Sequence, residues 1–90
     1  MNDKTLNTII KEIRDEQQIS PFIKDETLKQ YVKDGEYDIN QNSGTQIDYK
    51  DDLFARRLLK NYVMYANHKR LAEFKQLYYS DYAQLQAKYY

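Results

Sequence analysis

The residues with the clearest potential for metal chemistry lie in the stretch YDINQNSGTQIDYKDD, residues 37–52. A calcium loop of the EF-hand type that began at Asp38 would have asparagines at its third and fifth positions, where oxygen ligands are required. Such a loop also needs glycine at position 6, an aliphatic residue at position 8 and glutamate at position 12. Here those positions hold serine, threonine and tyrosine. We therefore predict no metal site in this stretch.

Side chains suited to catalysis are equally sparse. His68 is the only histidine, and no cysteine is present to act as a nucleophile or as a zinc ligand. The chain has 2 glycines and no glycine-rich loop that could bind a phosphate group. Acidic residues on helix surfaces are usually solvated. We predict a protein that is not an enzyme and that uses no cofactor.

A group of basic residues could instead bind phosphates. Arg56, Arg57 and Lys60 would share one side of a helix, and Lys69, Arg70 and Lys75 follow them. Such a surface could contact the backbone of a nucleic acid. A nucleic-acid-binding domain, however, usually carries an excess of positive charge, and the formal net charge here is +0. The alternative is that these cations pair with carboxylates of the same chain, namely Asp34, Glu36, Asp38, Asp48, Asp51 and Asp52.

The neutral total conceals two halves of opposite charge. Residues 1–52 carry 12 acidic and 7 basic side chains, a net charge of −5. Residues 53–90 carry 2 acidic and 7 basic side chains, a net charge of +5. Opposite charges can attract each other within one molecule or between neighbouring copies. The sequence leaves both arrangements open.

Length and hydrophobicity predict one small domain, residues 1–90. A chain of 90 residues buries a limited core, and 10 tyrosines add large apolar rings with polar tips. No apolar run approaches the ~20 residues of a transmembrane helix. The N-terminal residues also lack the long apolar segment of a signal peptide. We expect a soluble protein that is not secreted and does not bind a membrane.

Hydrophobic periodicity predicts an all-α bundle of about four helices. The periodic stretches are residues 3–17, about 25–41, about 51–67 and about 70–88. In the first stretch, apolar residues recur at helical spacing, namely Leu6, Ile9, Ile10 and Ile13. Pro21 separates the first stretch from the second, a polar loop over about residues 41–50 follows the second, and residues 67–70 indicate a turn before the last. Gly35 in the second stretch indicates either a weak helix or the close approach of another part of the chain.

The last predicted helix carries two apolar lines. The first line would face the core and consists of Leu71, Phe74, Tyr78, Tyr82, Leu85 and Tyr89. The second lies roughly 100–120° away around the helix and consists of Ala72, Tyr79, Ala83 and Tyr90. Because one buried line is enough for a helix at the surface of a bundle, we predict that the second line forms an interface between subunits. The alternative is that its tyrosines lie half-exposed over the bundle.

Patterns in the last three predicted helices together resemble the small head–tail connector proteins of long-tailed bacteriophages, which are also called head-completion or adaptor proteins. They are DIN at the end of the second helix, ARxLLxNYVxYA in the third and LxEFxxxYxSDYAQLQ in the last. In the third helix the matching residues are Ala55, Arg56, Leu58, Leu59, Asn61, Tyr62, Val63, Tyr65 and Ala66. In the last helix they are Leu71, Glu73, Phe74, Tyr78 and residues 80–86. The resemblance covers about residues 19–87.

The resemblance implies a structural subunit of a phage virion. Such subunits form a ring on the portal vertex, extend the channel through which DNA passes without sequence recognition, and bind a further head-completion or tail-completion protein. The expected partners are the portal protein, that further protein and copies of the chain itself, and the ring can depend on the portal as a template. The implied location is the head–tail interface of the virion, after assembly in the host cytoplasm. No catalytic residue is implied.

The polar loop is the part of the chain that we expect to bind a partner, because binding residues concentrate in loops. The candidate residues of this partner-binding loop are Asn42, Gly44, Gln46, Asp48 and Tyr49. We expect the loop to lie at the surface and to be flexible in the isolated subunit. The competing hypothesis is a small helical protein that binds nucleic acid, or acts as a regulator, through the side with Arg56, Arg57 and Lys60.

Overall fold

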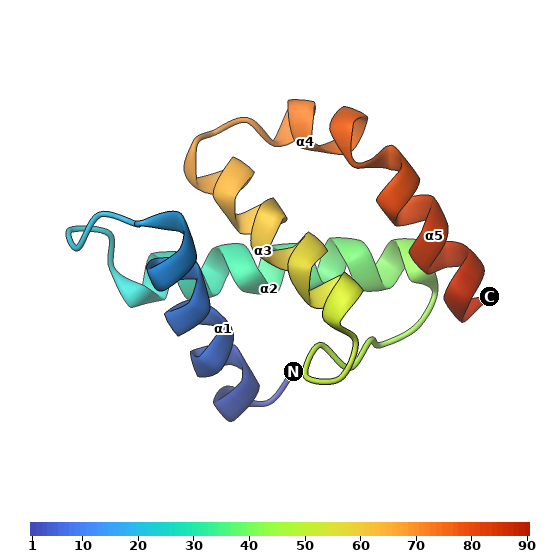
Figure 1. Cartoon of the computed structure of the whole chain (residues 1–90), viewed down its shortest axis with the longest axis horizontal. Coiled ribbons are helices and arrows are strands. Elements are labelled where there is room, and N and C mark those ends of the chain that lie inside the picture. Colours follow the sequence, from blue (N-terminus) through green and yellow to red (C-terminus); the bar gives the residue numbers. More distant parts are fainter.

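The structure is a computed structural model that describes all of residues 1–90. The predicted all-α class is confirmed, but there are five helices rather than about four. They are α1 (Asp3–Gln17), α2 (Asp25–Ser43), α3 (Leu53–Asn67), α4 (Leu71–Leu77) and α5 (Tyr79–Tyr89). Helix α2 runs through the middle of the molecule and packs against α1, α3 and α5 (Figure 1). None of the five is both long enough and apolar enough to cross a membrane.

Helix α1 forms where the sequence predicts it. The side chain of Asn2 accepts a hydrogen bond from the Thr5 N–H at 2.8 Å and so caps the first turn. The predicted apolar line is buried in the core, and it consists of Leu6, Ile9, Ile10 and Ile13. The helix ends at Gln18, which adopts a left-handed conformation with φ of 50°.

At Gly35, α2 lies close to α3. A Cβ atom at this position would lie 2.7 Å from Leu59 Cδ1 and 2.7 Å from Tyr62 Cδ1. Both of those side chains are buried, so they have little room to move. Of the two explanations for this glycine, close approach of another part of the chain is therefore the one that the structure bears out.

The predicted polar loop lies at residues 44–52, a few positions later than predicted, and part of it is buried. Helix α2 continues to Ser43, and Gly44 caps it with φ of 75°. Beyond it, Ile47 and Tyr49 are buried in the core, and Tyr49 is only 1% exposed. The Tyr49 hydroxyl donates a hydrogen bond to Asn40 Oδ1 at 2.8 Å. The expectation that Tyr49 contributes to an exposed partner-binding loop is wrong, because this apolar ring has a place in the core.

Hydrogen bonds join the end of α5 to the start of α3. The buried carboxylate of Asp52 caps α3 by accepting a hydrogen bond from the Ala55 N–H at 3.0 Å. It also accepts hydrogen bonds from Lys88 Nζ at 2.9 Å and from the Tyr89 hydroxyl. Burial alone would raise the pKa of Asp52, but these hydrogen bonds outweigh it and hold the pKa below its usual value.

The last predicted helix is interrupted at Tyr78, so the expectation of one continuous helix is wrong. The turn predicted at residues 67–70 is present, and Lys69 has φ of 59° there. After it, α4 packs against α3, whereas α5 packs against α2 (Figure 1). The bend at Tyr78 thus redirects the chain from one neighbour to another. A single straight helix could not pack against both α3 and α2 in this way.

An aromatic cluster fills the inside of this bend. Phe74, which is 0% exposed, stacks on Tyr78 with ring centroids 4.7 Å apart. Its ring also meets the edges of Tyr62 at 5.4 Å and Tyr82 at 6.0 Å. Tyr65 completes the cluster at 5.5 Å from Phe74. The rings therefore join α3, α4 and α5 into one core.

Candidate functional site

The predicted basic side of α3 is occupied by carboxylates of α1. Arg56 donates hydrogen bonds from Nε and Nη2 to the two carboxylate oxygens of Glu12, with Nε 3.1 Å from Oε1. Lys60 Nζ lies 3.1 Å from Glu12 Oε1 and 3.0 Å from Glu16 Oε1. The side chains of Arg56 and Lys60 are only 13% and 15% exposed. Only Arg57 of the three predicted residues is exposed without a carboxylate partner.

The identity of these partners differs from the sequence-based expectation. We expected the aspartates and glutamate of residues 34–52 to neutralise the basic residues, whereas Arg56 and Lys60 reach back to α1. Lys75 does pair with an expected partner, Asp38, at 3.0 Å. All these pairs join the acidic half of the chain to the basic half. The opposite charges of the two halves therefore attract each other within one molecule, which is one of the two arrangements that the sequence leaves open.

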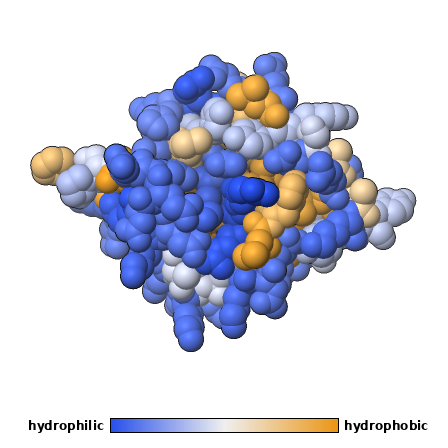
Figure 2. All heavy atoms as spheres, viewed as in Figure 1, coloured by the Kyte–Doolittle hydropathy of each residue, from blue (hydrophilic) through white to orange (hydrophobic).

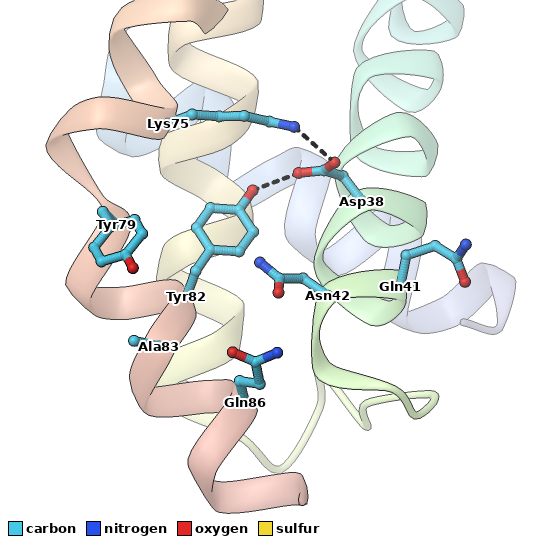
Figure 3. A pocket seen from close by; sticks show the side chains of 8 residues that line it. All are labelled: Asp38, Gln41, Asn42, Lys75, Tyr79, Tyr82, Ala83 and Gln86. Carbon is cyan, nitrogen blue, oxygen red and sulfur yellow. Dashed lines mark hydrogen bonds and ion pairs between the residues drawn. The ribbon is translucent and has the colours of Figure 1, made fainter.

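A groove lies between the C-terminal part of α2 and the side of α5 that faces it, and Lys75 of α4 also lines it (Figure 3). Its volume is about 450 Å³. We call it the α2–α5 groove, and its lining residues are Asp38, Gln41, Asn42, Lys75, Tyr79, Tyr82, Ala83 and Gln86. It has the size of an ordinary ligand pocket, but it is open and most of its lining residues are polar, whereas small-molecule pockets are mostly apolar.

The charges of the α2–α5 groove are used inside the protein. Asp38 accepts a hydrogen bond from Lys75 Nζ at 3.0 Å on one oxygen and from the Tyr82 hydroxyl at 2.6 Å on the other (Figure 3). Burial, followed by this hydrogen bond and the negative charge of Asp38, raises the pKa of Tyr82 well above its usual value. Tyr82 therefore stays protonated and keeps donating at physiological pH. No unpaired charge lines the groove.

The carboxamides of the groove, by contrast, have no partner. The side chains of Gln41, Asn42 and Gln86 make no hydrogen bond to the rest of the protein. All three residues line the groove, but in Figure 3 the side chain of Gln41 points away from α5. Asn40, which precedes Gln41, instead accepts hydrogen bonds on its side-chain oxygen from the Tyr49 hydroxyl and from the Ile47 N–H at 3.3 Å. A carboxamide offers two donor hydrogens and an acceptor oxygen. The groove thus presents free hydrogen-bonding groups without net charge.

The predicted subunit interface is divided by the bend at Tyr78. Tyr79 and Ala83 line the α2–α5 groove, and Tyr79 is 76% exposed. Ala72 lies exposed on α4, before the bend, and Tyr90 lies exposed beyond the end of α5. The four residues therefore do not form one continuous line.

The predicted loop residues are similarly distributed. Asn42 joins Tyr79 and Ala83 in the α2–α5 groove. Gly44 and Gln46 border a second hollow of about 620 Å³ on another side of α2, which also includes Gln41. Asp48 is exposed and accepts a hydrogen bond from the Lys50 N–H at 3.0 Å. Gln41 and Gln86 were not among the predicted residues, although the amide-rich runs INQN and QLQ contain them.

The residues that resemble a calcium loop are not in a loop. Asp38, Asn40 and Asn42 belong to the last turns of α2. The structure has no group of three or more histidine, cysteine or acidic side chains placed to hold a metal ion.

The molecular surface is hydrophilic over α1, while apolar atoms gather between α3 and α5 on the face shown in Figure 2.

Comparison with protein-family models, curated proteins and solved structures found no match in any of the three.

Proposed function

We propose that this chain is a non-catalytic binding protein and, more specifically, a head–tail connector subunit of a long-tailed bacteriophage. The observation that carries the proposal is the composition of the α2–α5 groove. It combines the exposed ring of Tyr79 with three unpaired carboxamides and one internally satisfied ion pair. Tyrosine is enriched in protein interfaces, and lysine, glutamate and aspartate are depleted there.

The connector role is supported by where the groove lies relative to the family-like patterns. Four of its eight lining residues belong to the DIN and SDYAQLQ patterns that resemble the connector proteins, namely Asp38, Tyr82, Ala83 and Gln86. In this role the subunits form a ring on the portal vertex, DNA passes through the ring without sequence recognition, and a further completion protein binds to it. The site of action is the virion, reached after assembly in the host cytoplasm.

The contacts of α3 weigh against the nucleic-acid-binding alternative. A protein gains affinity for DNA by placing cations on phosphates and releasing the counterions. Arg56 and Lys60 are held by Glu12 and Glu16, so a phosphate would have to displace a carboxylate that is already bound. Arg57 alone supplies little attraction.

The proposal is tested by mixing the purified protein with the portal protein encoded near it. Sedimentation and negative-stain electron microscopy should show an added collar of density on the portal. Tyr79→Asp should keep its helical content by circular dichroism, since Tyr79 is exposed, but should weaken the collar. Leu53→Asp changes another exposed apolar residue outside the groove and should leave the collar intact.

Absence of a collar at high protein concentration and low salt would contradict the connector role. A collar that forms equally well with Tyr79→Asp would contradict the role of the groove. Retardation of duplex DNA that falls steeply with salt, and that is lost on replacing Arg57 with alanine, would favour the nucleic-acid-binding alternative.

A further inference from the structure

We propose that the α2–α5 groove of one molecule binds residues 18–22 of a second copy of this chain, with Phe22 as the inserted side chain. The inference rests on the proposed function in one respect, since it names the occupant of the same groove. It concerns a contact between two copies of the chain and does not require the portal.

The inserted residue is presented on an ordered turn. Phe22 is 92% exposed, although its side chain is a pure hydrocarbon. Its N–H donates a hydrogen bond to Ser20 Oγ at 3.2 Å, and the Ile23 N–H donates to the Ser20 carbonyl at 3.1 Å. Arg14 Nη2 also donates to the Ile23 carbonyl at 2.6 Å. Pro21 restricts the turn further, so little conformational entropy is lost when Phe22 is bound.

Neither the segment nor the groove carries an unpaired charge. Residues 18–23, with the sequence QISPFI, contain no charged side chain, in a chain of which 31% is charged. The groove contains no unpaired charge, because Asp38 and Lys75 are bonded to each other. A charged segment would lose part of its hydration in the groove without gaining an opposite charge, which is unfavourable. An uncharged segment avoids that penalty.

The chemistry of the two surfaces is also complementary. Residues 18–22 are not part of a helix, so their peptide groups can bond to the free carboxamides of Asn42 and Gln86. The ring of Tyr79 and the methyl group of Ala83 provide the apolar contact for Phe22. The groove volume of about 450 Å³ falls within the usual range of sites that enclose an organic group.

A molecule cannot fill its own groove in this way. Residue 22 precedes the start of α2, whereas the groove begins at Asp38, near the other end of the same helix. At 1.5 Å per residue the two are separated by roughly 20 Å along the helix axis. In Figure 1 the connection between α1 and α2 and the helix α5 lie at opposite ends of the molecule. The contact must therefore be head-to-tail, with different surfaces on the two partners.

A pair of complementary variants tests this contact by sedimentation equilibrium. Phe22→Ala removes the inserted side chain and keeps the groove. Ala83→Arg blocks the groove and keeps the inserted side chain, at an exposed helix position where arginine is well tolerated. We expect the mass of the wild type to rise with concentration to more than twice 10.9 kDa. Each variant alone should stay at the monomer mass, and an equimolar mixture should double its mass and go no further.

Three results would overturn the inference. They are a wild type that stays monomeric up to millimolar concentration, a Phe22→Ala variant that associates as the wild type does, and a variant mixture that stays monomeric. Leu53→Ala, at an exposed apolar residue outside the groove, is the matched control and should associate normally; its failure to do so would place the contact elsewhere and contradict the inference. Gln86→Arg replaces Ala83→Arg if circular dichroism shows that the latter is not folded.

The experiment separates this contact from the connector role. A collar on the portal together with a monomeric variant mixture would refute the contact between copies and leave the proposed function in place. A variant mixture that dimerises, together with no collar, would support the contact and refute the connector role.

Discussion

Helix α2 makes contacts of two different kinds along its length. Against α3 the contact is close, because Gly35 allows Leu59 and Tyr62 to lie where its side chain would be. Against α5, a few residues further on, the helices leave a groove of about 450 Å³ lined by unpaired carboxamides. The first contact is closely packed, whereas the second leaves side-chain hydrogen-bonding groups without a partner in the protein. One helix makes both kinds of contact because its glycine and its exposed carboxamides are separated along the chain.

The largest effect should come from the aromatic core beside the close contact. We expect Phe74→Ala to lower the free energy of unfolding by about 3–5 kcal/mol, because it leaves a cavity among four rings. Urea denaturation followed by circular dichroism measures this loss. Tyr79→Ala, in the groove, should change the stability by no more than about 0.5 kcal/mol. Equal losses in the two variants would remove the distinction between the two contacts.

Gly35→Ala tests the close contact directly. Alanine in place of glycine inside a helix normally stabilises it by about 1 kcal/mol. Here the new methyl group would overlap Leu59 and Tyr62, and overpacking typically destabilises by about 1–3 kcal/mol. We expect a net loss of about 1 kcal/mol in the same denaturation experiment. A gain in stability would mean that α3 does not approach α2 as closely as described.

Two asparagines, two positions apart, allow a matched test of bonded and free carboxamides. Asn40→Ala removes the acceptor for the Tyr49 hydroxyl and the Ile47 N–H, and a buried hydroxyl without a partner costs about 1–3 kcal/mol. Asn42→Ala removes a groove carboxamide with no internal bond and should be nearly neutral in thermal denaturation. If Asn42→Ala is the more destabilising of the two, the groove is part of the structural core.

The smallest effect concerns the ion pairs between α1 and α3. Burial alone would raise the pKa of Glu12, but hydrogen bonds from Arg56 and Lys60 outweigh it and lower the pKa. Because the folded-state pKa lies below the unfolded value of about 4.3, the stabilisation is present at neutral pH and is lost as the pH falls below about 4. Glu12→Gln should therefore lower the stability by about 0.5 kcal/mol at pH 7.

The free energies of unfolding of wild type and Glu12→Gln should converge as the pH falls below about 4. Stability measured as a function of pH for wild type and Glu12→Gln provides the test. A difference that stays constant from pH 7 to pH 3 would show that the charge of Glu12 contributes nothing. Asp34→Asn, at an exposed acidic residue inside α2 whose hydrogen bond from Gln30 an asparagine oxygen can still accept, is the control and should match the wild type throughout.

Some features of the site could be predicted from sequence and others could not. Tyr79, Ala83 and Asn42 were expected to contact partners, and the structure places all three in one groove; whether they bind a partner remains a prediction. Gln41 and Gln86 were missed, because a surface carboxamide carries no periodic signal. Tyr49 was assigned to the surface because it stands in a polar stretch, yet Asn40 provides the hydrogen bond that allows its hydroxyl to be buried.

The sequence by itself determined the all-α class, the buried line of α1 and the turn before α4, because helical periodicity and turn residues act over a few neighbouring positions. Only the tertiary structure decided which carboxylates neutralise Arg56 and Lys60, since Arg56 and Glu12 are 44 positions apart. It also decided the bend at Tyr78, because there the chain stops packing against α3 and begins to pack against α2. Such features depend on which helices meet, and that depends on the packing of the whole core.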